Sequence, residues 1–391
     1  MKRYLIATLV FLMMLPLGAS AQWYLFPGGR PAKDSTSVDT KDPGFVPLRS
    51  DDDIPEEEEI AESIWTTRIS LILPLKSTST PNSNYLDFYS GVLLAADGLS
   101  TEDHKFNITV YDSTVSLPSS KELEETDLII GPVSFDDVSR VLPRARGKYI
   151  ISPLDPKVAS LTEKHNVIQA PSSSDAQIGE LASWIIDDMR GGDAVVLLQS
   201  ADEDSDEDAA VIARKLGEAG IKYEINSATE PYDGAVRGTC RFVLTSGNDA
   251  FCSQSVRDIA LMNLRGGHNV LYSTSRLRSI QDLEVESIHA AAARITATYY
   301  ADPSSAEVRK FSDKYRTLFK GDPGQWVYQG YDLMQYFGST LGRDAAQWQT
   351  EIAATPGNGL QTDFRFDESG KNNTAVRRLR YNSNNTITIL R

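Results

Sequence analysis

Short apolar runs alternate with segments of helical periodicity along most of the chain. The first runs have the length and β-branched content of buried strands: residues 69–73 (ISLIL), 107–112 (NITVYD), 127–131 (DLIIG), 148–152 (KYIIS) and 166–170 (NVIQA). Between them, apolar positions spaced three and four residues apart predict helices over residues 84–98 and 134–145. Strands and helices that alternate in this way predict a parallel sheet.

A second series of the same kind follows. Its predicted strands are residues 194–199, 221–225, 241–245, 268–273 and 293–300. The helices between them have start signals, which are a capping box of Ser174 and Gln177 and the N-cap residues Ser205 and Asn248. Two consecutive series predict an α/β protein with two mainly parallel sheets, each covered by helices.

The last part of the chain has a different order of elements. Ser304 and Glu307 form a capping box that opens a helix, and another helix is predicted over residues 325–341. Three short alternating segments end the sequence: residues 360–366, 375–381 and 386–390. These elements do not suit an independent domain, so we expect them to complete the two earlier units.

The predicted helix over residues 84–98 has two distinct faces. Beside its apolar stripe, Gly91, Ala95 and Gly98 form a stripe of small residues. A glycine inside a helix costs about 1 kcal/mol relative to alanine, so we expect this stripe to lie close to the sheet or to a neighbouring helix. The helix N-terminus follows the carboxyl end of the first strand, where ligands bind in open α/β sheets.

The N-terminus has the pattern of an export signal. Lys2 and Arg3 precede an apolar stretch over residues 4–17, and small residues stand at 19–21. The alternative is an uncleaved membrane anchor, but the stretch is shorter than the ~20 residues that span a bilayer. We expect residues 1–21 to be a cleavable signal peptide, and no cysteine follows it as a lipid-attachment site. The mature protein is then periplasmic or secreted, without membrane insertion.

The charge and the residues after the signal narrow the classes of partner. The chain has 39 Lys and Arg against 54 Asp and Glu, which argues against nucleic acid and anionic membranes as partners. Residues 22–65, rich in Pro, Gly, Ser and acidic groups, predict a disordered linker, with calcium binding as a weaker alternative. Cys240 and Cys252 lie too far apart along a strand and the following helix to bridge, so we expect free, buried thiols.

Five of these segments, in this order, resemble the type I periplasmic binding proteins of the branched-chain amino acid receptor group: ISLILPL, DFYSGVLLAAD, DLIIGPVSFDDV, KYIISPL and QWVYQGYDLMQYF. The resemblance implies two lobes joined by three hinge crossings, with ligands bound between the lobes. The crossings fall near Pro171, Asp302 and Pro356. Lobe 1 is then 66–170 plus 302–355, and lobe 2 is 171–301 plus 356–391.

Polar residues at the predicted strand ends, together with the family's Ser-Pro and Gly-Tyr-Asp motifs, give the candidate ligand-binding residues. Each hydroxyl has the alternative of a plain turn or helix cap. The candidates are Ser77, Thr78, Ser152 and Pro153 in lobe 1, Ser200, Ser246, Ser273 and Tyr300 in lobe 2, and Tyr331 and Asp332 near the hinge.

Catalytic motifs are missing from the sequence, which contains no GxSxG, HExxH or phosphate-binding loop, and its four histidines are scattered. We therefore expect no enzyme, no cofactor and no metal. Two interpretations of the resemblance stay open. The protein binds a small ligand, an amino acid or peptide-like, and delivers it to a partner such as an ABC permease. Alternatively, it is a cell-envelope interaction or regulatory module, related to peptidoglycan synthesis, that has lost solute binding.

The local sequence supports each interpretation in part. The resembling receptors have Ser-Gly after the first strand, where this chain has Lys76, and the acidic segment SADEDSDEDAA (200–210) replaces another cleft element. These departures favour an interaction module. The intact Gly-Tyr-Asp at residues 330–332 favours ligand binding.

Overall fold

The computed structural model of the protein describes residues 64–202, 206–227, 238–341 and 348–390. The predicted signal peptide, almost all of the predicted linker and the predicted cap Ser205 lie outside the described residues. Across the described residues, no helix combines the length and the apolar content needed to cross a membrane.

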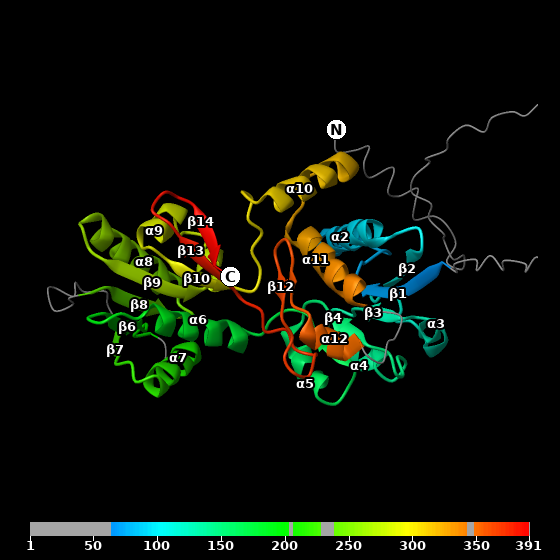
Figure 1. The fold of residues 1–391 in the computed structure, drawn as a ribbon, viewed down its shortest axis with the longest axis horizontal. Helices are drawn as coiled ribbons and strands as arrows, with labels where there is room; N and C mark the ends of the chain where they lie inside the picture. Colours follow the sequence, from blue (N-terminus) through cyan, green and yellow to red (C-terminus); the bar gives the residue numbers. More distant parts are fainter. Residues whose placement is uncertain (1–63, 203–205, 228–237, 342–347, 391) are drawn as a thin grey trace, which may run out of the picture. The chain divides into compact units, whose positions relative to one another are not determined.

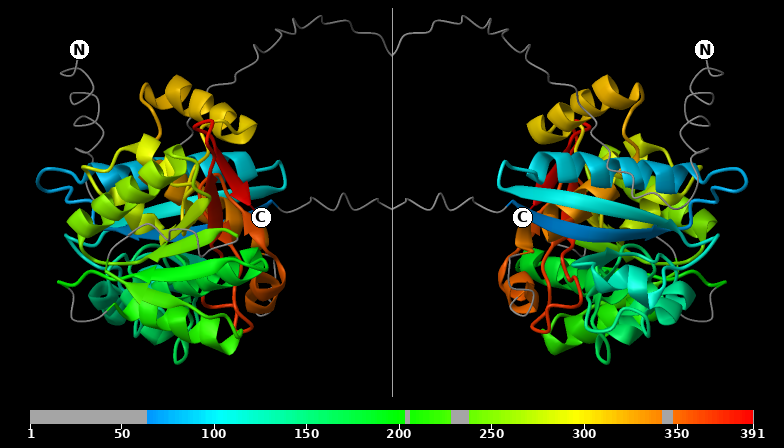
Figure 2. Two further views of the ribbon diagram at one scale, coloured as in Figure 1. Left: turned by 90° about the vertical axis from the view of Figure 1, so that its left-hand side faces the viewer. Right: turned by 90° about the vertical axis from the view of Figure 1, so that its right-hand side faces the viewer.

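The first sheet has five parallel strands in the order β2-β1-β3-β4-β5. Its strands are β1 (Trp65–Leu73), β2 (His104–Asp112), β3 (Leu128–Ile130), β4 (Ile150–Ser152) and β5 (Val167–Gln169). The five apolar runs of the first series are therefore confirmed as strands. Figure 2 shows the long strands β1 and β2, blue and cyan, side by side.

Helices cover both faces of this sheet. They are α2 (Ser83–Leu99), α3 (Ser120–Glu124), α4 (Phe135–Val141), η1 (Pro156–Val158), α5 (Ala159–Thr162), α10 (Ala306–Phe319), α11 (Gln325–Thr340) and α12 (Trp348–Ala354). Successive residues of a strand face opposite sides of the sheet. Leu71 and Ile151 accordingly pack in the cluster that contains α2 and α11, whereas Ile72 and Ile150 pack in the cluster that contains α4.

Helices α2 and α11 are in unusually close contact. A Cβ atom on Gly91 would lie 2.0 Å from the carbonyl oxygen of Val327, and one on Gly330 would lie 2.0 Å from that of Phe88. Each glycine therefore admits the backbone of the other helix. This confirms the prediction of a close neighbour for Gly91, whereas Gly98 borders open space, so its place in the small-residue stripe has no packing role.

The second sheet has seven strands in the order β14-β13-β10-β9-β8-β6-β7. The strands are β6 (Ala194–Leu198), β7 (Glu224–Asn226), β8 (Cys240–Leu244), β9 (Asn269–Thr274), β10 (Arg294–Ala297), β13 (Arg377–Tyr381) and β14 (Ile387–Leu390). The last two run antiparallel to their neighbours, and Figure 1 shows them beside β10. The helices are α6 (Ser174–Asp188), α7 (Glu207–Glu218), α8 (Asp249–Leu264), η2 (Ser275–Ser279) and α9 (Val285–Ala290).

Three predicted helix starts shift by one residue. The N-caps are Ser173, Asp206 and Ser305, because their side chains accept hydrogen bonds from the amide three residues later. Asn248 caps α8 as predicted. Cys240 and Cys252 are free and buried, as predicted.

The third crossing occurs later in the chain than the sequence indicated near Pro356. After α12 the chain forms a small antiparallel pair, β11 (Gly357–Asn358) and β12 (Asp363–Phe364). Phe364 and Phe366 still pack in the core of the first sheet, and the chain joins the second sheet only at Arg377. The predicted strand over 360–366 is thus reduced to two residues, because residues 359–362 turn around a carboxylate of α11.

Candidate ligand-binding site

Three segments connect the two sheets: the first follows β5, the second follows β10 and the third precedes β13. These connections are hydrogen-bonded to one another. Asn373, on the third connection, donates from Nδ2 to the carbonyl of Ala170 on the first at 2.8 Å. The hydroxyl of Ser172 donates to the carbonyl of Ala375 at 2.5 Å. On the second connection, the amide of Tyr300 donates to the carbonyl of Gln361 at 2.8 Å. The connections therefore form one bonded hinge.

Arg377 is the central cation of this hinge, and only 2% of its surface is exposed. Its Nε lies 3.0 Å from Oδ2 of Asp363, and its Nη2 lies 2.5 Å from Oδ1. The same guanidinium donates to the carbonyls of Tyr300 and Gly359. A two-point ion pair whose remaining donors are satisfied is the geometry that compensates burial of a charge.

Asp332, the acid of the Gly-Tyr-Asp motif, organises the turn between β11 and β12. Its carboxylate accepts the backbone amides of residues 360, 361 and 362 at 2.7, 2.8 and 2.9 Å. Burial raises the pKa of Asp332 to about 6, although the three amides and Arg377 act in the opposite direction. The side chain thus ties α11 to the hinge.

Tyr331 and Gln329 lie beside Asp332 on α11 with different surroundings. The ring of Tyr331 is half-buried and packs against Phe311, with ring centroids 4.6 Å apart. Gln329 accepts a hydrogen bond from the side chain of Gln361 at 3.1 Å and donates to the carbonyl of Pro153 at 3.4 Å. Gln329 was not among the predicted residues, although its position three residues before Asp332 places it on the same helix face.

The predicted residues after β1 have an internal partner. The amide and hydroxyl of Ser77 both donate to Oδ2 of Asp112, at 2.7 and 2.6 Å. These bonds, with two more from Thr114, lower the pKa of Asp112 to about 2 against the effect of its partial burial. Thr78 is exposed. The loop before α2 is therefore held by a carboxylate of the protein itself.

Ser152 ends β4 and is paired in register with Gln169 on β5. Both side chains are almost fully buried. Among the described residues, neither the Ser152 hydroxyl nor the side-chain amide of Gln169 has a hydrogen-bond partner. Ser152 thus differs from Ser77, Ser200, Ser246 and Ser273, whose hydroxyls have partners within the protein.

The predicted hydroxyls of the second sheet come together at its carboxyl edge. Ser200 accepts a hydrogen bond from the side-chain amide of Asn248 at 3.3 Å, and Ser246 accepts one from the backbone amide of Asn248 at 3.1 Å. Ser273 donates to the carbonyl of Leu244 at 2.6 Å. Tyr300 is buried, and burial raises its pKa to about 12. The prediction that these residues contact a ligand stays a prediction.

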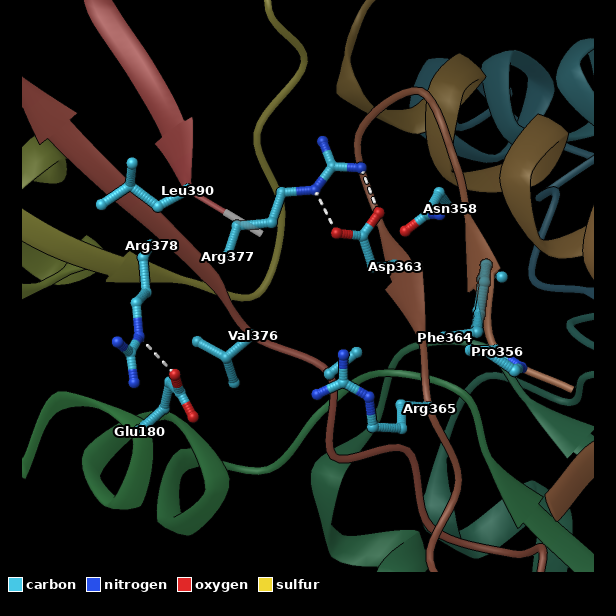
Figure 3. Close-up of a pocket in the computed structure, with 12 residues that line it drawn as sticks. Glu180, Pro356, Asn358, Asp363, Phe364, Arg365, Val376, Arg377, Arg378 and Leu390 are labelled. Carbon is cyan, nitrogen blue, oxygen red and sulfur yellow. Dashed lines mark hydrogen bonds and ion pairs between the residues drawn. The ribbon is translucent and has the colours of Figure 1, made fainter. Parts of the chain in front are cut away.

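A cavity of about 290 Å³ lies at the hinge, beside β12 and β13. Figure 3 shows its charged groups: Arg377 pairs with Asp363, and Arg378 pairs with Glu180 at 2.5 Å. Arg365 lines the same cavity, and no hydrogen bond or ion pair of its guanidinium is found among the described residues. None of the ten predicted ligand-binding residues lines this cavity.

Arg365 is an exposed residue whose backbone is held by two hydrogen bonds. Its amide donates to Oδ1 of Asn373 at 2.9 Å, and its carbonyl accepts the amide of Thr374 at 2.8 Å. Apolar side chains also line the cavity: Pro356, Phe364, Val376 and Leu390. The cavity therefore combines one unneutralised cation with apolar walls, which suits an anionic group on a small apolar body.

Metal binding has no support in the described residues, where no three His, Cys, Asp or Glu side chains gather as ligands. The acidic segment over residues 200–210 has three alternating acids at a calcium-like spacing, Asp202, Asp204 and Asp206, of which Asp206 caps α7. Asp204 lies outside the described residues.

Comparisons with known proteins place this geometry in a structural class. No family model matches the sequence, and no curated protein matches it. A solved structure from Rhodospirillum rubrum, described as a branched-chain amino acid ABC transporter, matches with a TM-score of 0.60 at 16% identity, covering 83% of this chain and 100% of that one.

A second solved structure is the C-domain of LpoA from Haemophilus influenzae, described as a regulator of PBP1A. It matches with a TM-score of 0.51 at 13% identity, over 83% of this chain and 100% of that one. At such identities the similarity shows the fold alone. The protein has the two-lobed type I periplasmic-binding fold in a divergent form, as its sequence predicted.

Proposed function

We propose that this protein is an exported, non-enzymatic binding protein that holds a small carboxylate-bearing ligand, such as an amino acid or a short peptide, between its two lobes. The observation that carries the proposal is Arg365, an unpaired guanidinium in a cavity of about 290 Å³ at the hinge. A carboxylate bonds a guanidinium at two points, which gives both orientation and affinity.

The cavity's location connects binding to the hinge. The cavity is lined by β12 on one side. On the other side it is lined by Glu180 on α6 and Arg378 on β13, which belong to the second sheet and its helices. A ligand on Arg365 then contacts groups that belong to both lobes. Two-lobed proteins close around ligands by hinge motion when the closed state makes the additional contacts.

A thermal-shift screen of residues 22–391 against amino acids, dipeptides and their amidated forms tests the proposal. A ligand at 100 times its dissociation constant adds about 2.7 kcal/mol to the free energy of unfolding. We expect a free carboxylate to be required and Arg365→Ala to reduce the shift. The control is Arg309→Ala, which removes an exposed arginine on α10 and leaves the shift unchanged.

Screening results that are silent for every compound, or a shift that is undiminished in Arg365→Ala, would overturn the proposal. Export has its own test. Sequencing the N-terminus of the protein recovered from the cell envelope is expected to begin after Ala21, and an intact Met1 would contradict the predicted signal peptide.

A second candidate function has a specific observation in its favour. Three of the predicted ligand residues, Ser77, Ser200 and Ser273, already use their hydroxyls in hydrogen bonds within the protein. A solute would have to compete with these internal bonds. A fold that no longer binds solutes can serve as an envelope interaction module, and LpoA is a protein of this fold described as a regulator of PBP1A. Specific capture of one envelope protein by a ligand-silent chain would favour this function.

A further inference from the structure

A second cavity, of about 680 Å³, lies at the amino-terminal ends of the parallel strands of the seven-stranded sheet. The predicted ligand residues of this sheet lie at the other, carboxyl ends of the strands. The cavity is formed where β9 and β10 begin, and where the turn over residues 382–385 follows β13. Neither the hinge residues nor the ten predicted ligand-binding residues line it. Its chemistry is therefore separate from the proposed function.

Two arginines that line this cavity are directly opposed across a strand pair. Arg294 on β10 is in register with Arg380 on the antiparallel strand β13. Side chains in such positions have Cβ atoms about 5 Å apart, and like charges there are destabilising. Burial, and then the charge of Arg380, lower the pKa of Arg294. The pair therefore needs a compensating negative charge.

Only one member of the pair has that compensation among the described residues. Arg294 forms an ion pair with Asp188 and donates to the hydroxyl of Tyr272 at 2.9 Å. Tyr272 in turn donates to Oδ2 of Asp188 at 2.7 Å, the same oxygen that pairs with Arg294. For the exposed guanidinium of Arg380, no hydrogen bond or ion pair is found in the part of the chain that the structure describes.

Polar side chains in the same cavity can bond hydroxyls. The Nδ1 atom of His289 lies 2.7 Å from the carbonyl oxygen of Asn382, so Nδ1 carries the proton and donates. In the uncharged ring with that tautomer, the other nitrogen, Nε2, is an acceptor. The side-chain amide of Asn269 lines the cavity as well and supplies donors and an acceptor. Among the described residues of the lining, Glu286 is the one acidic side chain.

We infer that this cavity is a second binding site, and that it takes a small anionic sugar, whose oxyanion pairs with Arg380 and whose hydroxyls bond His289 and Asn269. The oxyanion supplies the negative charge that Arg380 lacks. The cavity's volume is ample for a monosaccharide derivative. Sugar phosphates and sugar acids share this chemistry, and the experiment distinguishes them.

Isothermal titration of residues 22–391 with glucose 6-phosphate, glucuronate, inorganic phosphate and glucose tests the inference. We expect one of the two anionic sugars to bind at least tenfold more tightly than phosphate, and glucose not to bind. Arg380→Ala is expected to weaken that binding at least tenfold, and Arg365→Ala to leave it unchanged. The matched control is Arg214→Ala, an exposed arginine on α7.

The outcomes separate the parts of the inference. Phosphate that binds as tightly as the tighter-binding of the two anionic sugars would overturn the role of the hydroxyl partners. Binding that is equal in Arg380→Ala, or absent for all four compounds, would overturn the site itself. Since Arg365 lies at the hinge cavity and Arg380 at this one, failure here is distinguishable from failure of the proposed function.

Discussion

Arg377 on β13 and Asp363 on β12 form a two-point ion pair, with oxygen–nitrogen distances of 2.5 and 3.0 Å, that joins the strand pair of the hinge to the second sheet. The pair is buried, and the same arginine also bonds the carbonyl of Tyr300 on another connection. One side chain therefore holds two of the three connections in place.

Removal of one partner leaves the other charge buried and unpaired. Arg377→Ala is expected to lower the free energy of unfolding by about 3–5 kcal/mol, measured by urea denaturation. Lys314→Ala, which breaks the exposed pair with Asp97, is expected to cost less than about 1 kcal/mol. Similar losses in the two variants would show that Arg377 is not a structural centre of the hinge.

The close contact of α2 and α11 predicts opposite effects for two glycines of one helix. Gly91→Ala places a Cβ against the backbone of α11 and is expected to cost at least about 2 kcal/mol. Gly98→Ala meets no atom within 4 Å and is expected to be neutral or to stabilise by up to about 1 kcal/mol. Thermal unfolding of both variants checks the pair, and a tolerated Gly91→Ala would contradict the contact.

Much of the fold was predictable because parallel strands that are buried on both faces appear in the sequence as continuous apolar runs. Gly91 was identified because a glycine inside a helix is destabilising relative to alanine, which indicates that close packing offsets the cost. Arg377 was not identified, since an arginine in an alternating strand ordinarily faces solvent, and its burial depends on Asp363 and on carbonyls distant in sequence.

The candidate site was less predictable than the fold. Strand ends identified Ser77, Ser200 and Ser273, but the sequence does not show that Asp112, Asn248 and Leu244 bond them. The hinge cavity depends on the third connection, which the sequence placed too early. Arg365 was therefore assigned to a strand and not to a cavity.

The raised pKa of Asp332 predicts a pH dependence of stability. The folded protein holds this proton up to about pH 6, whereas an unfolded aspartate releases it near pH 3.9. Between these values the folded state binds more protons, so the free energy of unfolding falls as pH rises, by about 3 kcal/mol from this group.

Asp332→Asn cannot titrate and is expected to remove that slope, as measured by urea denaturation between pH 4 and pH 7. Asp112 does not interfere in this window, because its lowered pKa acts below pH 4, where stability from its hydrogen bonds is lost as pH falls. An unchanged slope in Asp332→Asn would show that other groups cause the pH dependence.

The central claim, that a small carboxylate ligand binds at the hinge through Arg365, is tested most directly by isothermal titration. The strongest compound from the screen is titrated into the wild type, Arg365→Ala and Arg309→Ala. Loss of a charged hydrogen bond of about 1.5–3 kcal/mol predicts dissociation constants weakened roughly 10- to 150-fold in Arg365→Ala alone. Equal affinity in all three proteins, with one ligand bound per chain, would contradict the account.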